Sequence, residues 1–263
     1  MKVIYTKTNS GGNCTIIQHG SIRFMIDAGI NPKLIHKESG ERLSQINYCF
    51  ITHAHLDHTQ YLSEVLKYNI WVYMSVETFN YLNLKVNPYK AKIKIVDIKQ
   101  ILTLNNFWVI LFNLPHYDNN GEPMNNYGFA FVDSVTNERL LYCTDCAYIK
   151  YIFPPCDIYM IECNYYDIED TSDIIPMMNL NVEKRRLRSH MSVQMFIKFF
   201  KEQDFSKCNE IYLLHISENF SPDKMVGEIQ ESLKLEEKNI KLCCNTEGNN
   251  NVNRAARRGT RLQ

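Results

Sequence analysis

Three histidines and an aspartate fall within six residues of one another, at the end of an apolar run. They are His53, His55, Asp57 and His58. Imidazole nitrogens and carboxylate oxygens are the ligands that zinc and similar transition metals prefer, and such side chains offer little apolar surface to a core. The spacing therefore predicts a metal site rather than a polar turn with a chance group of histidines.

Three more polar residues arrive later in the chain, each directly after an apolar run typical of a buried strand. They are His116, Asp145 and His215. A single histidine after a strand is more often structural than functional. Three such residues in equivalent positions, in addition to the cluster, indicate that several strands deliver side chains to one site.

The elements that must position these residues alternate between strand and helix. Helices are expected near 31–39, 61–68, 76–84, 191–203 and 223–234, the fourth with an apolar face. Strands are expected near 3–5, 14–18, 22–26, 47–51, 71–74, 93–96, 107–114, 129–132, 140–144, 158–162 and 211–214. The strand at 47–51 leads directly into the histidine cluster, and a glycine-containing loop is expected at 8–14.

The chain of 263 residues is long enough for a substantial core, and we expect one domain over residues 1–245. Residues 167–188 begin acidic and end basic, and are interpreted as an insertion or lid, or else as a solvated surface loop. Residues 246–263 are basic and poor in apolar side chains, so a disordered tail is expected there.

Composition and charge narrow the class of protein. Hydrophobic residues make up 45% of the chain and charged residues 22%, as in ordinary soluble proteins. No apolar run approaches the length of a bilayer span and no signal peptide is evident, so we expect a cytoplasmic location without membrane contact. Basic and acidic residues number 29 each, and four arginines lie in the last sixteen residues. The remainder is mildly acidic, which disfavours a generic polynucleotide binder and favours a small substrate.

The nine cysteines are irregularly spaced and are expected to be reduced thiols. Cys143 and Cys146 flank Asp145 as a C-x-x-C pair, which leaves a redox or zinc interpretation open as a less favoured alternative. No second cysteine pair of this spacing accompanies it, so the aspartate between them is the preferred candidate.

The order of these residues resembles the signature of the metallo-β-lactamase superfamily, which is an early Asp, then H-x-H-x-D-H, then His, Asp and His. The resemblance implies an α/β (α+β) fold, a four-layer αββα sandwich over residues 1–245, and two divalent metal ions, zinc or else manganese. Asp27 matches the early aspartate and would orient the ligands from behind. The implied ligands are His53, His55 and His116 for the first ion, Asp57, His58 and His215 for the second, and Asp145 for both.

This resemblance implies a metal-dependent hydrolase. Two metals about 3.5–4 Å apart polarise a phosphoryl or acyl oxygen and acidify a water between them, so that a bridging hydroxide attacks at neutral pH. An aspartate at position 145 instead of a cysteine resembles the phosphodiesterase, nuclease and thioesterase-like branches. Asp57 is expected to take part in catalysis as well as in metal binding.

A narrower resemblance comes from Ser189-His-Met-Ser192, which looks like the late His-x-Ser/Thr motif of tRNase Z-like phosphodiesterases. It implies that His190 donates a proton or binds phosphate, and Glu162 is a candidate for its orienting partner. The alternative is a serine helix cap with an incidental histidine. Glu162 is proposed only because it too follows a strand.

Other segments resemble the YycJ-type bacterial exonuclease-like subgroup and phage cyclic-nucleotide phosphodiesterases of the anti-Pycsar kind. These segments are Thr8-Asn-Ser-Gly-Gly-Asn13, Leu114-Pro-His-Tyr-Asp118 with Tyr127-Gly-Phe129, Lys184-Arg-Arg186 and Leu214-His-Ile-Ser-Glu-Asn219. Gln60-Tyr61 replaces the x-Gly that usually follows the cluster in tRNase Z, and no Gly/Pro-rich arm is present, which argues against tRNA 3′-processing. The resemblance implies a homodimeric phosphodiesterase whose substrate is a nucleotide or nucleic acid. A thioester or lactone hydrolase and a non-catalytic binding module on the same fold are the alternatives.

Overall fold

Two β-sheets packed face to face form the centre of the molecule, which is described by a computed structural model. The structure describes residues 1–83, 92–118, 121–166, 189–217, 221–238 and 240–244. The predicted insertion at 167–188 and the predicted tail at 246–263 lie outside these residues.

The first sheet is built by the N-terminal third of the chain. Its strands lie in sequence order: β1 (Lys2–Asn9), β2 (Gly12–His19), β3 (Ile22–Ile26), β4 (Tyr48–Phe50), β5 (Trp71–Met74) and β6 (Ile93–Ile95). Strands β1 to β3 are antiparallel, whereas β3 to β6 run parallel. The carboxyl ends of β3 and β4 therefore point to the same edge.

The second sheet holds seven strands in the order β13-β12-β11-β10-β9-β8-β7. Strands β7 to β10 are antiparallel and β10 to β13 parallel. Their bounds are β7 (Ile101–Leu104), β8 (Phe107–Leu114), β9 (Asn126–Asp133), β10 (Arg139–Cys143), β11 (Ile158–Glu162), β12 (Glu210–Leu214) and β13 (Lys241–Cys244).

Helices cover the outer face of each sheet. They are α1 (Pro32–Ser39), α2 (Leu56–Thr59), α3 (Leu62–Val65), α4 (Val76–Tyr81), α6 (Val193–Glu202) and α7 (Pro222–Leu233), with a 3-10 turn η1 (Leu43–Gln45). Helix α6 begins at Ser192, whose side chain accepts a hydrogen bond from the amide of Met195 and so caps the helix. None of the described helices is long and apolar enough to span a membrane.

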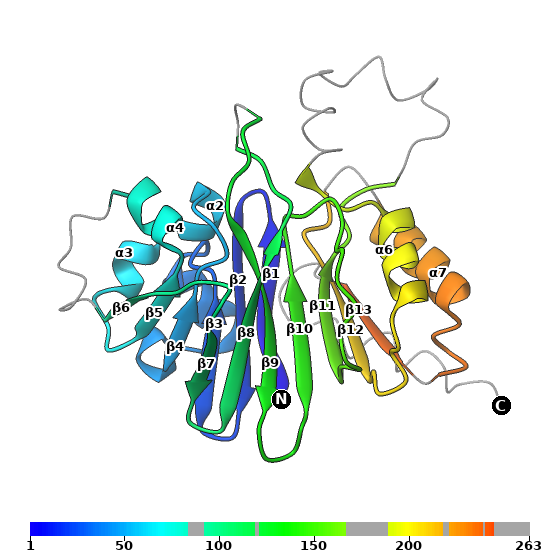
Figure 1. Cartoon of the computed structure of the whole chain (residues 1–263), viewed down its shortest axis with the longest axis horizontal. Coiled ribbons are helices and arrows are strands. Elements are labelled where there is room, and N and C mark those ends of the chain that lie inside the picture. The colour runs from blue at the N-terminus through cyan, green and yellow to red at the C-terminus, as the bar shows by residue number, and fades with distance from the viewer. Residues whose placement is uncertain (84–91, 119–120, 167–188, 218–220, 239, 245–263) are drawn as a thin grey trace.

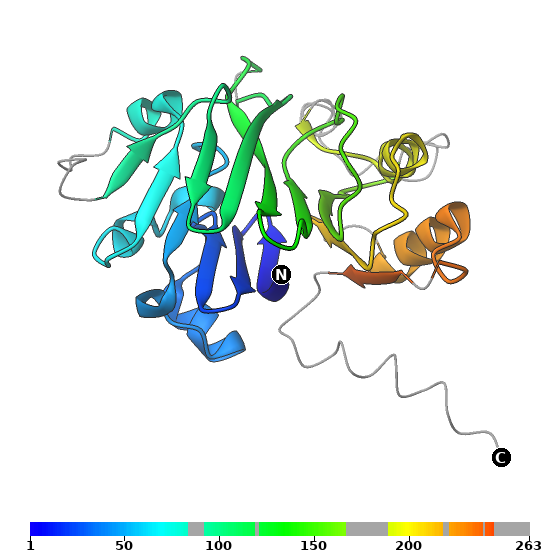
Figure 2. The same cartoon turned by 60° about the horizontal axis from the view of Figure 1, so that its bottom comes forward.

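Three apolar clusters separate these layers. One joins the first sheet to α1, α3 and α4, and another joins the second sheet to α6 and α7. The third lies between the sheets and is rich in aromatic rings, among them Phe24, Phe50 and Phe131. In Figure 1 strands β7 to β9 of the second sheet overlap strands β1 to β3 of the first, with helices at both sides, and Figure 2 shows α6 and α7, in yellow and orange, on the side of the second sheet. The predicted four-layer αββα arrangement is confirmed.

Three details of the secondary structure differ from the sequence-based prediction. The expected loop at 8–14 is mostly strand, because β1 and β2 pair from Asn9 opposite Gly12 onward and leave only a tight turn between them. The expected helix at 61–68 is replaced by the short helix α3, which follows α2. Strands β7 and β13, at the two edges of the second sheet, were not predicted.

Candidate metal centre

The predicted ligands lie where strands of both sheets end. Asp27 follows β3, the cluster from His53 to His58 follows β4, and His116, Asp145 and His215 follow β8, β10 and β12. Strands β8 and β10 both run antiparallel to β9, and β10 to β12 run parallel, so the carboxyl ends of β8, β10 and β12 lie at one edge of the second sheet and bring residues far apart in sequence together there.

Three of these residues have a left-handed backbone, which side chains other than glycine seldom adopt. The φ angles are 61° at Asp27, 51° at Asp145 and 54° at His215. A left-handed conformation costs on the order of 1–2 kcal/mol for a residue with a Cβ. Strain of this kind gathers at functional sites, because the surrounding fold holds side chains in positions that relaxed backbone would not give them.

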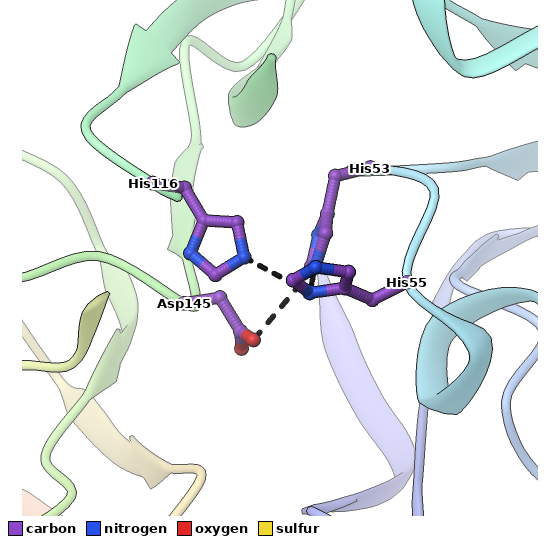
Figure 3. A group of neighbouring side chains, drawn as sticks. All are labelled: His53, His55, His116 and Asp145. Atoms are coloured by element: carbon purple, nitrogen blue, oxygen red, sulfur yellow. Dashed lines mark hydrogen bonds and ion pairs between the residues drawn. The ribbon is translucent and has the colours of Figure 1, made fainter. Parts of the chain in front are cut away.

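The first group of ligand atoms comes from His53, His55, His116 and Asp145 (Figure 3). The Nδ1 atom of His55 lies 3.1 Å from Nε2 of His53 and 3.1 Å from Nε2 of His116. The Oδ2 atom of Asp145 lies 3.8 Å from Nε2 of His53. A tetrahedral ion with bonds of about 2.0–2.1 Å to nitrogen has ligand atoms roughly 3.4 Å apart, so these side chains fit one zinc-sized ion.

The second group comes from Asp57, His58 and Asp145. The Nε2 atom of His58 lies 3.4 Å from Oδ2 of Asp145 and 3.5 Å from Oδ2 of Asp57. Asp145 thus belongs to both groups, as expected of a bridging ligand. Two groups of ligand atoms that share one carboxylate fit a pair of neighbouring ions, although His215 is not part of the group formed by Asp57 and His58.

His215 reaches the site through a third group, which it forms with Asp145, Glu162 and His190. Its Nδ1 atom lies 3.8 Å from Oδ1 of Asp145. Its buried Nε2 atom has no hydrogen-bond partner among the described residues. A buried nitrogen without a partner is costly, and a metal ion would satisfy it.

Asp27 supports this centre from behind. Its fully buried carboxylate accepts hydrogen bonds from the amide of Thr52 at 2.8 Å and from the Thr52 hydroxyl at 3.0 Å. The Nδ1 atom of His58 lies 2.7 Å from its Oδ2 atom. Because Nδ1–H donates to Asp27, the lone pair of His58 Nε2 faces Asp57 and Asp145.

The charges of the site also suit metal binding. Burial, together with neighbouring histidines, holds the pKa of His53 well below its usual value and lowers the pKa of His116 to about 3. Both rings are therefore neutral, which is the form that binds metal. Burial alone would raise the pKa of Asp145, but His215 and His58 hold it well below its usual range, so this carboxylate is ionised.

His58 behaves differently, because it faces two carboxylates. Burial by itself lowers the pKa of His58, yet Asp145 and Asp27 raise it well above its usual value. Negative charge that favours a proton on His58 Nε2 favours a metal cation there as well, and the cation would displace the proton.

Glu162 holds two histidines at once. Its carboxylate is fully buried and accepts the amide of Cys146 at 2.5 Å. Its Oε1 atom lies 2.7 Å from Nδ1 of His190 and 3.1 Å from Nδ1 of His215. The two rings stack with centroids 4.9 Å apart, and the His190 side chain remains 20% exposed. The structure therefore brings together the predicted pair and adds His215 to it.

Other residues at the site were not singled out from the sequence. The side-chain amide of Asn13 donates to Oδ2 of Asp57 at 3.0 Å and lies 3.0 Å from Nε2 of His58. The side-chain amide of Asn164 donates to the backbone oxygen of His215 at 2.6 Å. The only sequence feature that could have marked Asn13 as a site residue was its place in the expected glycine-containing loop. No sequence feature marked Asn164.

Gly29 brings the turn after β3 against the ligand-bearing helix α2. The amide of Ala28 donates to the oxygen of His58 at 2.7 Å, and the amide of Gly29 donates to the oxygen of Asn13 at 2.8 Å. A Cβ at Gly29 would lie 1.7 Å from the backbone oxygen of Asp57. Only glycine fits this approach.

Comparison with known proteins agrees with this geometry. The family model described as "Beta-lactamase superfamily domain" matches residues 22–216, a span that contains all seven predicted ligands and His190. A comparison with curated protein sequences finds no match.

Three solved structures resemble the chain over most of their length. The metallo-β-lactamase fold protein YhfI from Bacillus subtilis has a TM-score of 0.66 and 17% identity, covering 94% of this chain and 95% of that one. Unliganded yeast PDE1 has a TM-score of 0.68 and 14% identity, covering 94% and 97%. The short form of human tRNase Z has a TM-score of 0.57 and 16% identity, covering 83% and 93%. At these identities the likeness shows the fold, and the match of the family model shows the family: the chain belongs to the β-lactamase superfamily and has the metallo-β-lactamase fold.

Proposed function

We propose that this protein is a metal-dependent phosphodiesterase that cleaves a nucleotide or nucleic acid, with zinc or manganese as its two divalent ions. The observation that carries the proposal is the placement of His190. Its ring stacks on the candidate ligand His215 and is anchored through Nδ1 to the buried carboxylate of Glu162. The other histidines of the site are accounted for as ligands, so His190 is available for a different task.

That task is protonation of the leaving group. A sugar alkoxide is a poor leaving group unless it receives a proton, and a positioned histidine supplies one efficiently. With Nδ1–H donated to Glu162, the partly exposed ring of His190 presents Nε2 to the substrate. A thiolate leaves without protonation, so a thioesterase would gain little from this arrangement.

The two ions, when bound, would acidify a water and polarise the phosphoryl oxygens. Five imidazoles among seven ligands favour zinc, although carboxylates also suit manganese. Asp57 is 26% exposed and accepts from Asn13, so its carboxylate can orient a water at the open side. The general resemblance to human tRNase Z, whose name gives it an RNA substrate, supports a phosphodiester without choosing among nucleotide substrates.

The test compares leaving groups. A histidine that donates a proton matters for a dinucleotide or cyclic nucleotide, whose leaving oxygen is basic, and matters much less for bis-p-nitrophenyl phosphate, whose phenolate leaves unaided. We expect His190→Ala to lower kcat on the nucleotide roughly 10²- to 10⁴-fold and to lower kcat on the aryl diester far less. His36→Ala, on the exposed surface of α1, is the matched control.

Full activity of His190→Ala on the nucleotide would remove the proton-donor role. Hydrolysis of an acyl ester or lactone in preference to every phosphodiester would replace the proposal with the acyl hydrolase alternative. Metal analysis that finds neither zinc nor manganese would favour a binding module. The homodimer expected from the resemblance is checked on the same sample by light scattering, and the cytoplasmic location stays a prediction.

A further inference from the structure

A cavity of about 200 Å³ opens beside the metal centre. It lies between α4, the loop that carries the histidine cluster, and the connection between β8 and β9, which Figure 1 shows at the same end of the sandwich. Its lining residues are Ala54, Glu77, Thr78, Tyr81, Asp118, Pro123, Met124 and Asn125. None of the metal-ligand candidates lines it.

Two residues of the cavity wall are directly connected to candidate metal ligands. Ala54 stands between His53 and His55 in the sequence, and the amide of Met124 donates to the backbone oxygen of His116 at 3.0 Å. A group bound here would therefore lie beside the atom that reacts. Drug-sized ligands occupy roughly 300–1,000 Å³, so this smaller space suits a single ring system.

The lining offers a stacking surface and acceptors. Tyr81 is 62% exposed, and an accessible aromatic ring next to apolar walls favours the flat face of a base. Among the described residues, the lining includes two carboxylates, Glu77 and Asp118, and no Lys, Arg or His. The carboxylate of Asp118 is held in place, because its Oδ1 accepts the amide of Glu122 at 2.9 Å.

The charges of the cavity lining determine which part of the substrate binds at the metal centre and which part binds in the cavity. Phosphate would be repelled by Glu77 and Asp118 and is attracted to bound metal ions, so the phosphodiester belongs at the metals and the cavity takes a group without negative charge. Ionised carboxylates only accept hydrogen bonds. The group must therefore present N–H donors toward the cavity wall.

We infer that the cavity binds the guanine base of the substrate, an inference that rests on the proposed phosphodiesterase function. The Watson–Crick edge of guanine has two adjacent donors, N1–H and the N2 amino group, which one carboxylate can accept together. Adenine and cytosine present one amino donor next to an acceptor, and uracil presents one N–H between two acceptors. Glu77 and Asp118 would leave those acceptors facing negative charge.

The experiment measures kcat/KM of the metal-loaded protein on cyclic GMP, cyclic AMP and bis-p-nitrophenyl phosphate, and then on dinucleotides that carry guanine or adenine. We expect guanine to be preferred roughly 10- to 100-fold, the discrimination typical of a good bidentate pair. Glu77→Gln should reduce the ratio of guanine to adenine substrate toward one. The control is Glu64→Gln on α3, a half-buried glutamate paired with Lys67, which should leave that ratio unchanged.

A second variant separates stacking from hydrogen bonding. Tyr81→Ala should lower kcat/KM on guanine and adenine substrates alike, and Tyr81→Phe should restore it, because the ring face is kept. Thermal unfolding of each variant verifies that it folds.

The possible outcomes test guanine binding separately from the proposed phosphodiesterase activity. Hydrolysis of the aryl diester with equal kcat/KM on guanine and adenine substrates overturns the base assignment and leaves the phosphodiesterase in place. A preference for glycerophosphocholine over all nucleotides also overturns it, since the cavity would then take a cation. Absence of hydrolysis of every phosphodiester overturns both.

Discussion

Replacing Glu162 by glutamine tests whether one buried carboxylate organises both the metal ligand and the proton donor. The change keeps the volume of the side chain but turns one oxygen into an NH2 group. In the structure Oε2 accepts the amide of Cys146, while Oε1 lies within hydrogen-bond distance of Nδ1 in His190 and His215. Turned one way, its NH2 group faces the amide N–H of Cys146; turned the other way, it faces Nδ1 of the two histidines and can no longer accept their N–H groups.

The size of the effect follows from those contacts. A hydrogen bond to a charged group contributes about 1.5–3 kcal/mol, and loss of a partner behind a metal ligand typically costs 10- to 100-fold in affinity or activity. We therefore expect Glu162→Gln to weaken the metal held by His215 roughly 10- to 100-fold. At saturating zinc, turnover of a dinucleotide should fall about a further tenfold or more, since His190 loses the same acceptor.

Two measurements separate these effects. A competing chelator gives the affinity of each metal, and kcat on a dinucleotide at saturating zinc gives the catalytic loss. Glu210→Gln is the matched control, because that glutamate accepts from the Tyr212 hydroxyl at the opposite end of β12. If Glu162→Gln binds both metals as tightly as the wild type and turns over the dinucleotide at the same rate, Glu162 positions neither histidine.

Four further changes test the packing and the metal dependence of the site. In a urea titration, Gly29→Ala should lower the free energy of unfolding by about 1–3 kcal/mol or more, because its Cβ would lie 1.7 Å from the backbone oxygen of Asp57. The control is Gly227→Ala in α7, where a Cβ would have nothing within 4 Å. This variant should raise the free energy of unfolding by up to about 1 kcal/mol. Asp27→Asn, which weakens the acceptor for the ring of His58, should reduce the bound metal from two ions toward one in elemental analysis. Chelation should lower the Tm in scanning fluorimetry, since metal at 100 times its Kd adds about 2.7 kcal/mol; an unchanged Tm would argue against bound metal. In chelator, Asp145→Gly should unfold at higher urea than Asp145→Ala, because φ is 51° there and a Cβ costs about 1–2 kcal/mol in that region.

The ligand set could be predicted because its signal is local. The cluster from His53 to His58 lies in one turn after one strand, and each later ligand follows an apolar run. Strands β8, β10 and β12 run in the same direction and end at a common edge, so their ends marked His116, Asp145 and His215 as candidates for one site. Their assignment as ligands of two ions came from the resemblance. The four-layer arrangement, in contrast, was implied by the resemblance to the metallo-β-lactamase superfamily.

The supporting contacts could be predicted only in part, because their partners are distant in sequence. Glu162 was expected beside His190 because it follows a strand, whereas its contact with His215 and the role of Asn13 were not expected. Asn13 contacts Asp57 across 44 positions, and Glu162 contacts His215 across 53. The sequence around Asn13 or Glu162 does not predict which strand end will lie next to that side chain in the fold. Their roles depend on how the two sheets pack.

The secondary-structure differences have local causes. In β7 the outward-facing residues Ile101 and Thr103 are exposed, and the inward-facing residues are only half buried. The strand therefore lacks the clear alternation of apolar and polar residues by which a half-buried strand is recognised. The expected helix at 61–68 is interrupted at its start, because the amide of Tyr61 donates to the backbone oxygen of Ala28. That contact ties the segment to the turn beside the metal centre instead of extending a helix.

The metal centre also joins the two sheets. His53, His55, Asp57 and His58 come from the first sheet, whereas His116, Asp145 and His215 come from the second. Ions held by both sets would link the sheets at this end, so their binding free energy would add to the stability of the sandwich.

Two hydrogen bonds already align the sheets there without a metal. The amide of His215 donates to the hydroxyl of Thr8 at 2.8 Å, and the amide of Tyr127 donates to the oxygen of Thr52 at 3.0 Å. Each joins a strand end of one sheet to the other sheet beside a ligand. A slip between the sheets would have to break these bonds before it separated the two sets of ligands. The residue types of the ligands can therefore be recognised from the sequence near each strand end. The distances between the ligands depend on contacts between the two sheets, and no local sequence pattern predicts those contacts.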